Sequence, residues 1–116
     1  MLNRGAMILK YREPAIRWIN ETDPIKDSRE VTPELLTQDL RVYLVPDDAV
    51  ATDLEVRKWI EANFEWLFEA ELESWYTDPS LWPRERTLEL FRQWFDVECH
   101  SMVIDTVDGV LLNEDV

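Results

Sequence analysis

The sequence has 116 residues and a formal net charge of −13, so it has the size of one domain and repels nucleic acid and anionic membrane surfaces. Hydrophobic residues make up 46% of it. This content is too high for an intrinsically disordered chain, despite the large net charge. With one cysteine and no apolar run of membrane-spanning length, we expect a single cytoplasmic domain over residues 1–116.

The first predicted elements are a strand and a helix. Residues 6–11 form a short apolar run typical of an edge strand, and we expect 7–11 to join a sheet. Met7 precedes that run and is a second candidate for the start, which makes residues 1–6 a disordered extension. Pro14 then suits a first helical position, and the helix is expected to end at Asp23-Pro24.

A short helix and a strand are predicted next. Thr32-Pro33-Glu34 reads as an N-cap, a proline at the first helical position and an acid in the first turn, so we expect a helix through Gln38. Residues 41–45 are rich in β-branched and aromatic side chains and stop at Pro46. This composition predicts a strand that is buried on both faces.

The clearest predicted element is a long helix over 52–75. Thr52 and Glu55 have the spacing of a capping box, and no glycine or proline follows until Pro79. Its apolar arc is broader than that of an ordinary surface helix, which indicates a central helix or an oligomer interface. The opposite side carries carboxylates spaced four residues apart, namely Glu61, Glu65, Glu69 and Glu73.

Glu71 interrupts the apolar side of this helix. A buried carboxylate must find a partner or take up a proton. We expect a structural salt bridge, with Arg84, Arg86 and Arg92 as candidate partners, or a capping acid to a neighbouring loop. The functional alternative is a general acid, a general base or one metal ligand.

The C-terminal third is predicted to hold a loop, a helix over 85–95 and a hairpin. Asp108-Gly109 is a strong two-residue hairpin signal, and it would pair a strand over 97–107 with residues 110–113. Residues 114–116 are expected to fray. The fold class is therefore α+β: a small antiparallel or mixed sheet with a C-terminal hairpin, packed against the long central helix and the second helix.

Cys99 and His100, the only cysteine and the only histidine, are adjacent. On a strand their side chains point to opposite faces, so they cannot form a nucleophile and its base, and Cys99 is expected in the core. Glu98 and His100 share a face, and with Glu71 they would form a polar cluster able to hold a metal. One histidine is few for a hydrolytic zinc site, so we expect no metal site, no cofactor and no catalytic residue.

Aromatic side chains gather around the end of the long helix. Trp75, Tyr76 and Trp82, with Arg84, could anchor a protein partner, because Trp, Tyr and Arg are enriched at interface hot spots. The alternative is that they close the core. Glu65 and Glu69 are the carboxylates most suited to a basic partner.

Three functional hypotheses follow. We favour a non-catalytic protein–protein interaction module, of adaptor, inhibitor or immunity type, whose protein partner is basic; a homodimer is left open. The second is an acidic decoy that occupies the nucleic-acid site of a basic protein. The third is a metal-assisted enzyme built on Glu71, Glu98 and His100. Direct nucleic-acid or membrane binding is not expected, and only two glycines, Gly5 and Gly109, rule out a phosphate-binding loop or a dinucleotide fingerprint.

Overall fold

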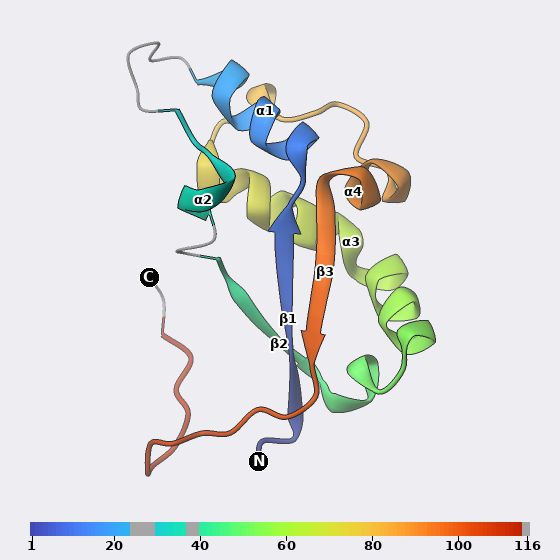
Figure 1. Cartoon of the computed structure of the whole chain (residues 1–116), viewed down its shortest axis with the longest axis vertical. Helices are drawn as coiled ribbons and strands as arrows, with labels where there is room; N and C mark the ends of the chain where they lie inside the picture. Colours follow the sequence, from blue (N-terminus) through green and yellow to red (C-terminus); the bar gives the residue numbers. More distant parts are fainter. Residues whose placement is uncertain (24–29, 37–39, 115–116) are drawn as a thin grey trace.

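The structure, a computed structural model, describes residues 1–23, 30–36 and 40–114. It confirms the α+β class in one domain (Figure 1). Strands β1 (Arg4–Tyr11), β2 (Val42–Pro46) and β3 (Phe95–His100) form an antiparallel sheet in the order β2-β1-β3. The long helix α3 (Asp53–Trp75) lies behind this sheet.

Strand β1 is central, not an edge strand. Met7 faces Tyr43 of β2 on one side and Cys99 of β3 on the other. Residues 4–6, which the sequence placed in a disordered extension, belong to this strand instead. A Cβ atom at Gly5 would clash with the side chain of Val50, so the strand packs closely against the following 3-10 turn, η1 (Asp47–Val50).

Two short helices lie on either side of residues 24–29, which are outside the described part of the chain. Helix α1 (Glu13–Thr22) has Pro14 in its first turn, as predicted, and buries Ala15 and Ile19. Helix α2 (Pro33–Leu36) begins after Thr32, whose hydroxyl accepts a hydrogen bond from the Leu35 backbone N–H. The predicted continuation through Gln38 falls on residues 37–39, outside the described residues.

Helix α3 confirms the long helix and its cap. The Thr52 hydroxyl accepts a hydrogen bond from the Glu55 backbone N–H at 3.1 Å, which satisfies one of the free donors of the first turn. The buried side of the helix carries Ile60, Leu67, Phe68 and Leu72. No helix among the described residues has the length and apolar content to cross a membrane.

The core is largely aromatic. After α3, the chain makes the 3-10 turn η2 (Pro79–Leu81) and helix α4 (Leu88–Trp94), which leads directly into β3. The ring of Phe68 is fully buried between three rings from this last region, those of Phe91, Trp94 and Phe95, at centroid distances of 5.5–5.7 Å. These edge-to-face contacts fasten α3 to α4 and β3.

Strand β2 differs from its prediction. Val45 is its one buried residue, whereas Val42 and Leu44 are exposed. The strand lies at the edge of the sheet and only its inner side meets α3 and η1, so burial on both faces is wrong.

The C-terminal hairpin is also wrong. Strand β3 ends at His100, and residues 110–113 form no strand. Gly109 does have the positive φ of 117° that a tight turn needs. However, β1 pairs with β3 only from Ala6 to Tyr11. Beyond the end of β3, one backbone hydrogen bond of 2.7 Å, from the Leu2 N–H to the Val103 carbonyl, joins the C-terminal segment to the residues before β1. Past that bond the segment has no neighbouring strand within the described ranges.

Candidate functional site

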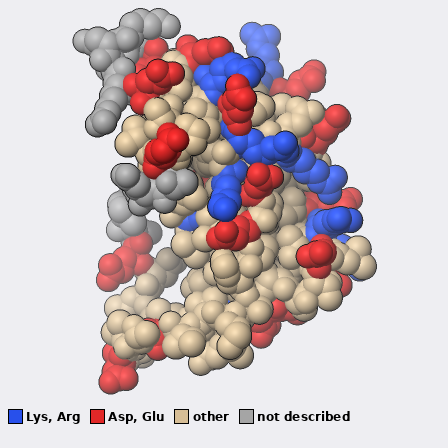
Figure 2. All heavy atoms as spheres, in the orientation of Figure 1, with Lys and Arg blue, Asp and Glu red and all other residues tan. Residues whose placement is uncertain are grey.

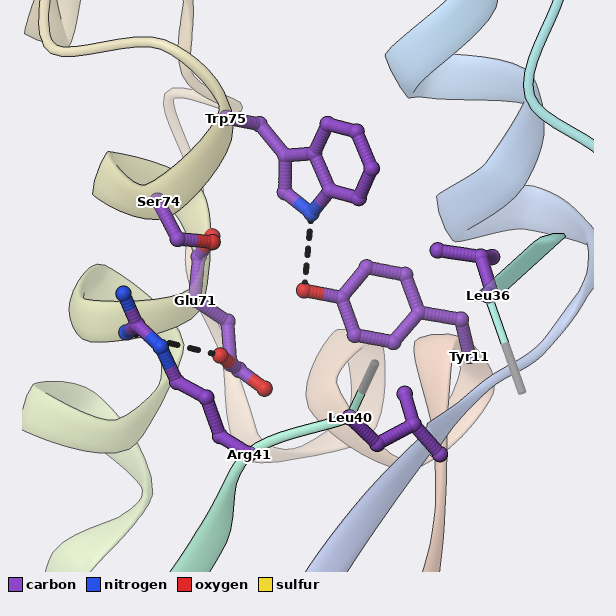
Figure 3. Close-up of a pocket in the computed structure, with 7 residues that line it drawn as sticks. All are labelled: Tyr11, Leu36, Leu40, Arg41, Glu71, Ser74 and Trp75. Carbon is purple, nitrogen blue, oxygen red and sulfur yellow. Dashed lines mark hydrogen bonds and ion pairs between the residues drawn. The ribbon is translucent and has the colours of Figure 1, made fainter. Parts of the chain in front are cut away.

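A cavity of about 310 Å³ with partly polar walls lies on the inner side of the sheet. It lies between the C-terminal turns of α3, the end of β1 and the chain around β2 and α2 (Figure 3). Its walls are mixed, with charged, hydroxyl, aromatic and aliphatic groups. They are formed by Tyr11, Leu36, Leu40, Arg41, Glu71, Ser74 and Trp75.

Glu71 is the buried acid of this cavity, with only 4% of its surface exposed. Its burial agrees with its place on the apolar side of the helical pattern, which alone left open whether the side chain is buried, but the predicted ion-pair partners are wrong. Oε2 of Glu71 lies 3.8 Å from Nη1 of Arg41, and within the described residues it forms no ion pair with Arg84, Arg86 or Arg92. Arg86 instead pairs with the exposed Glu69 at 3.5 Å.

Burial sets the acid–base properties of the site. Desolvation raises the pKa of Glu71 above its ordinary value of 4.5, and the Arg41 guanidinium and a weaker interaction with the Tyr43 hydroxyl offset only part of this rise. Burial, followed by the charge of Glu71, raises the pKa of Tyr43 to about 12 and that of Tyr11 still further. Both phenols therefore stay protonated at neutral pH.

The hydroxyls of these tyrosines are bonded unequally. Nε1 of Trp75 donates to the Tyr11 hydroxyl at 3.0 Å, and the two rings meet edge to face. The Tyr43 hydroxyl is buried and forms no hydrogen bond of ordinary geometry within the described part of the chain, so its interactions with Arg41 and Glu71 are weak. A buried polar atom without a partner is costly and usually has a reason, such as a ligand or water.

The predicted cluster of Glu71, Glu98 and His100 is not brought together. Glu98 pairs across the sheet with Ile8, and His100 with Ala6, whereas the Tyr11 beside Glu71 pairs with Phe95. Alternation along the strands therefore places Glu98 and His100 on the outer face and Glu71 behind the inner face. Among the described residues, no group of three or more His, Cys, Asp or Glu side chains could hold a metal ion.

On the outer face, Glu98 is the centre of a surface ion-pair group. Lys10 Nζ lies 3.2 Å from one of its carboxylate oxygens and His100 Nε2 lies 3.1 Å from the other. Hydrogen bonds from His100 and Lys10 lower the pKa of Glu98. This contact between Glu98 and His100 is the one expected of neighbours on one strand face.

Cys99 points to the inner face, opposite to His100, as predicted. It is half-buried against the core, and its burial raises the pKa of the thiol. A thiol in this setting lacks the depressed pKa of a catalytic nucleophile.

The aromatic patch at the end of α3 is tied to its own chain. The Tyr76 hydroxyl donates to the Ile19 carbonyl, and Trp82 Nε1 donates to the Tyr76 carbonyl at 2.7 Å. With Trp75, these side chains are half-buried and their polar atoms have partners, which matches the alternative that they close the core. Arg84 is the exposed member of the predicted set.

A second candidate site is an exposed apolar segment near the C-terminal end of the described chain, where the sequence predicted a hairpin. Residues 101–114, which we call the C-terminal arm, leave the end of β3, bend at Gly109 and run back outside the body of the molecule (Figure 1). Six large apolar side chains of this arm are between 58% and 87% exposed. They are Met102, Ile104, Val107, Val110, Leu111 and Leu112.

A signal for this arm was present in the sequence. After Arg92 the chain contains no lysine or arginine, while acids such as Asp105, Asp108 and Glu114 alternate with the apolar residues. The hairpin interpretation assigned these apolar side chains to a sheet and so hid their exposure.

Comparison of the chain with models of known protein families, with curated proteins and with solved structures finds no match. The functional interpretation therefore depends on the residues and their geometry alone.

Proposed function

We propose that the protein is a non-catalytic interaction module that binds a basic protein partner through its C-terminal arm. The observation that carries the proposal is the arm's row of exposed apolar side chains, 58–87% accessible within a segment of 14 residues, 101–114. Exposed apolar side chains gathered in this way mark interaction sites in soluble proteins.

The charge of the arm supports a basic partner. Asp105, Asp108 and Glu114 are interleaved with the apolar residues, and no lysine or arginine follows Arg92. Apolar contacts would supply most of the affinity, while the carboxylates would steer a basic surface toward the arm and raise the association rate. A second copy of the chain is disfavoured, because it would bring two acidic arms together.

The outer face of the sheet is a second exposed apolar surface. Val42 and Leu44 are exposed beside the half-buried Ile8, and no described helix covers them. Figure 2 shows that the lower half of this face carries few charged side chains, in contrast to its upper half. The arm and this face could contact one partner together. A cytoplasmic location remains part of the proposal, supported by the unpaired thiol of Cys99.

Affinity capture with matched variants tests the proposal. The intact protein, a Val110→Ser/Leu112→Ser arm variant and a Val42→Ser/Leu44→Ser face variant would be used in parallel, with bound proteins quantified by mass spectrometry. We expect a basic protein that is enriched by the intact chain and lost with the arm variant. Binding of purified partner should then weaken with salt and with Asp105→Asn/Asp108→Asn.

Two results would overturn it. One is capture of the same partner, with the same affinity, by the arm variant. The other is a binding partner whose contact surface is acidic. Light scattering of the free protein covers the remaining alternative, since a stable dimer that the arm variant converts to a monomer would identify a second copy as the occupant.

An acidic decoy is the second candidate function. The observation in its favour is that Glu61, Glu65, Glu69 and Glu73 are all exposed along α3, at intervals of about 6 Å along the helix axis. The ion pair between Glu69 and Arg86 reduces the charge of this row. The decoy predicts that Glu65→Lys/Glu69→Lys abolishes binding and that the arm variant does not, which is the reverse of the result expected above.

A further inference from the structure

The cavity beside Glu71 is independent of the C-terminal arm and has the properties of a ligand site. We propose that it binds a small neutral molecule with a flat apolar body and an amide group.

The first observation is that the Glu71 carboxylate is buried with little hydrogen bonding. Arg41 Nη1, its one ion-pair partner among the described residues, is 3.8 Å away, beyond the 2.7–3.2 Å of an ordinary N–H···O bond. The Tyr43 hydroxyl is buried and interacts only weakly with Glu71 and Arg41, since it forms no hydrogen bond of ordinary geometry among the described residues. A carboxylate this deeply buried normally accepts several hydrogen bonds, so it can still accept one from a ligand.

The second observation is a donor at the same cavity. Nη1 of Arg41 donates to the Ala70 carbonyl at 3.1 Å, which holds the guanidinium beside Glu71. Its side chain is 53% exposed, and a guanidinium has five N–H groups in a planar fork. Figure 3 shows Arg41 and Glu71 next to each other on one side of the cavity. An acceptor and a donor are therefore presented together.

The charge of this pair selects the ligand class. Arg41 would repel a cation that approached Glu71, and Glu71 would repel an anion that approached Arg41. An amide avoids both penalties, because its N–H can donate to the carboxylate while its carbonyl accepts from the guanidinium. Specific polar ligands of this kind are strongly selected when they complete the hydrogen bonding of buried groups.

The remaining walls define the body of the ligand. Opposite the ion pair, Figure 3 shows the rings of Tyr11 and Trp75 with the side chains of Leu36 and Leu40. Aromatic and aliphatic walls with a few converging polar groups are typical of small-molecule sites, and about 310 Å³ is at the lower end of their range. A single-ring amide is the size that we infer.

Three probes of one shape but different charge test this inference. Benzamide is neutral, benzoate is an anion and benzamidine is a cation. The readout is the indole N–H resonance of Trp75, whose Nε1 donates to Tyr11 at the cavity wall. The indole of Trp66 donates to Asn63 on the exposed side of α3 and is the internal control.

We expect benzamide to shift the Trp75 resonance saturably, with millimolar affinity, and to leave the Trp66 resonance in place. Arg41→Met and Glu71→Leu each remove one charged hydrogen-bonding group, so each should weaken binding by about tenfold or more. Glu71→Gln keeps a carbonyl acceptor and should lose less. Arg57→Met removes an exposed arginine from α3, the helix that carries Glu71, and should leave benzamide binding unchanged.

Each of three results would overturn the inference: no saturable shift of Trp75 with benzamide, binding of benzoate or benzamidine at least as tight as that of benzamide, or unchanged binding in Arg41→Met. Because Arg41 is half exposed, that variant is expected to fold even if Glu71→Leu does not, and the unchanged positions of the other indole resonances would show that it has.

Discussion

The two faces of the sheet differ strongly in how far the rest of the chain covers them. On the inner face of β1, Met7 and Leu9 are fully buried under α3 and the aromatic core. On the outer face of the same strand, Ile8 is half-buried and Lys10 exposed. The fold is thus stabilised from one side. The outer face and the C-terminal arm can change with little effect on stability, which is the freedom that a contact surface needs.

The largest expected effect is on the inner side. Phe68→Ala removes a fully buried ring that touches three others, so we expect the free energy of unfolding to fall by about 3–5 kcal/mol. Urea denaturation followed by tryptophan fluorescence measures it. Leu112→Ala on the arm is the matched truncation and should change the stability by less than about 0.5 kcal/mol. Equal losses at both positions would erase the distinction between the two regions.

Substitution of Glu71 is expected to change the free energy of unfolding by a smaller amount and to raise it. Its pKa in the folded state is raised above 4.5, so its contribution to stability is full below the unfolded pKa and is lost as the pH rises through the folded pKa. Glu71→Gln removes this loss and should be more stable than the wild type at neutral pH, with the difference vanishing in acid.

Urea midpoints measured between about pH 4 and pH 8 test this sign. Glu65→Gln, at an exposed position of the same helix, is the control and should leave the midpoint unchanged at neutral pH. A Glu71→Gln protein that is less stable than the wild type at neutral pH would mean that the ion pair with Arg41 outweighs the cost of burying the acid.

The cap of α3 gives a third, intermediate comparison. Thr52→Ala removes the acceptor of the Glu55 N–H and should cost about 1 kcal/mol. Thr106→Ala, an exposed threonine of the arm, should have no measurable effect on thermal unfolding. A stability loss at Thr106 as large as that at Thr52 would indicate that the arm is packed on the body.

The smallest expected change in stability belongs to the arm itself. Val110→Ser/Leu112→Ser should leave the free energy of unfolding within about 0.5 kcal/mol of the wild type, because both side chains are at least 75% exposed. The same variant should bind less of a dye that reports exposed apolar surface. Unchanged dye binding together with a large loss of stability would contradict the exposed arm.

What could be predicted from the sequence was local. The capping box at Thr52 and the absence of glycine and proline defined α3, and the helical pattern placed Glu71 on its apolar side without deciding whether the side chain is buried. Arg41 could not be predicted as its partner, because that contact depends on where β2 lies relative to α3. The central position of β1 likewise depends on pairing between residues far apart in the chain.

The C-terminal hairpin shows that a local signal can be correct while the strand pairing predicted from it is wrong. Asp108-Gly109 is a correct signal for a local bend, since Gly109 has a positive φ. A turn brings two segments near each other, but a strand also needs a neighbour whose backbone groups it can pair with and a core to cover. Residues 110–113 have neither in the described structure.

The central place of β1 has a consequence for how the chain folds during synthesis. This strand is synthesised before both of its partners, which are residues 42–46 and then 95–100. Until the second of these has emerged, the apolar side of β1 with Met7 and Leu9 has no complete sheet to join. Pairing at such long sequence separation slows folding and leaves nascent chains prone to aggregation. We therefore expect the domain to fold late and in one step, and the nascent chain to depend on protection until β3 is made.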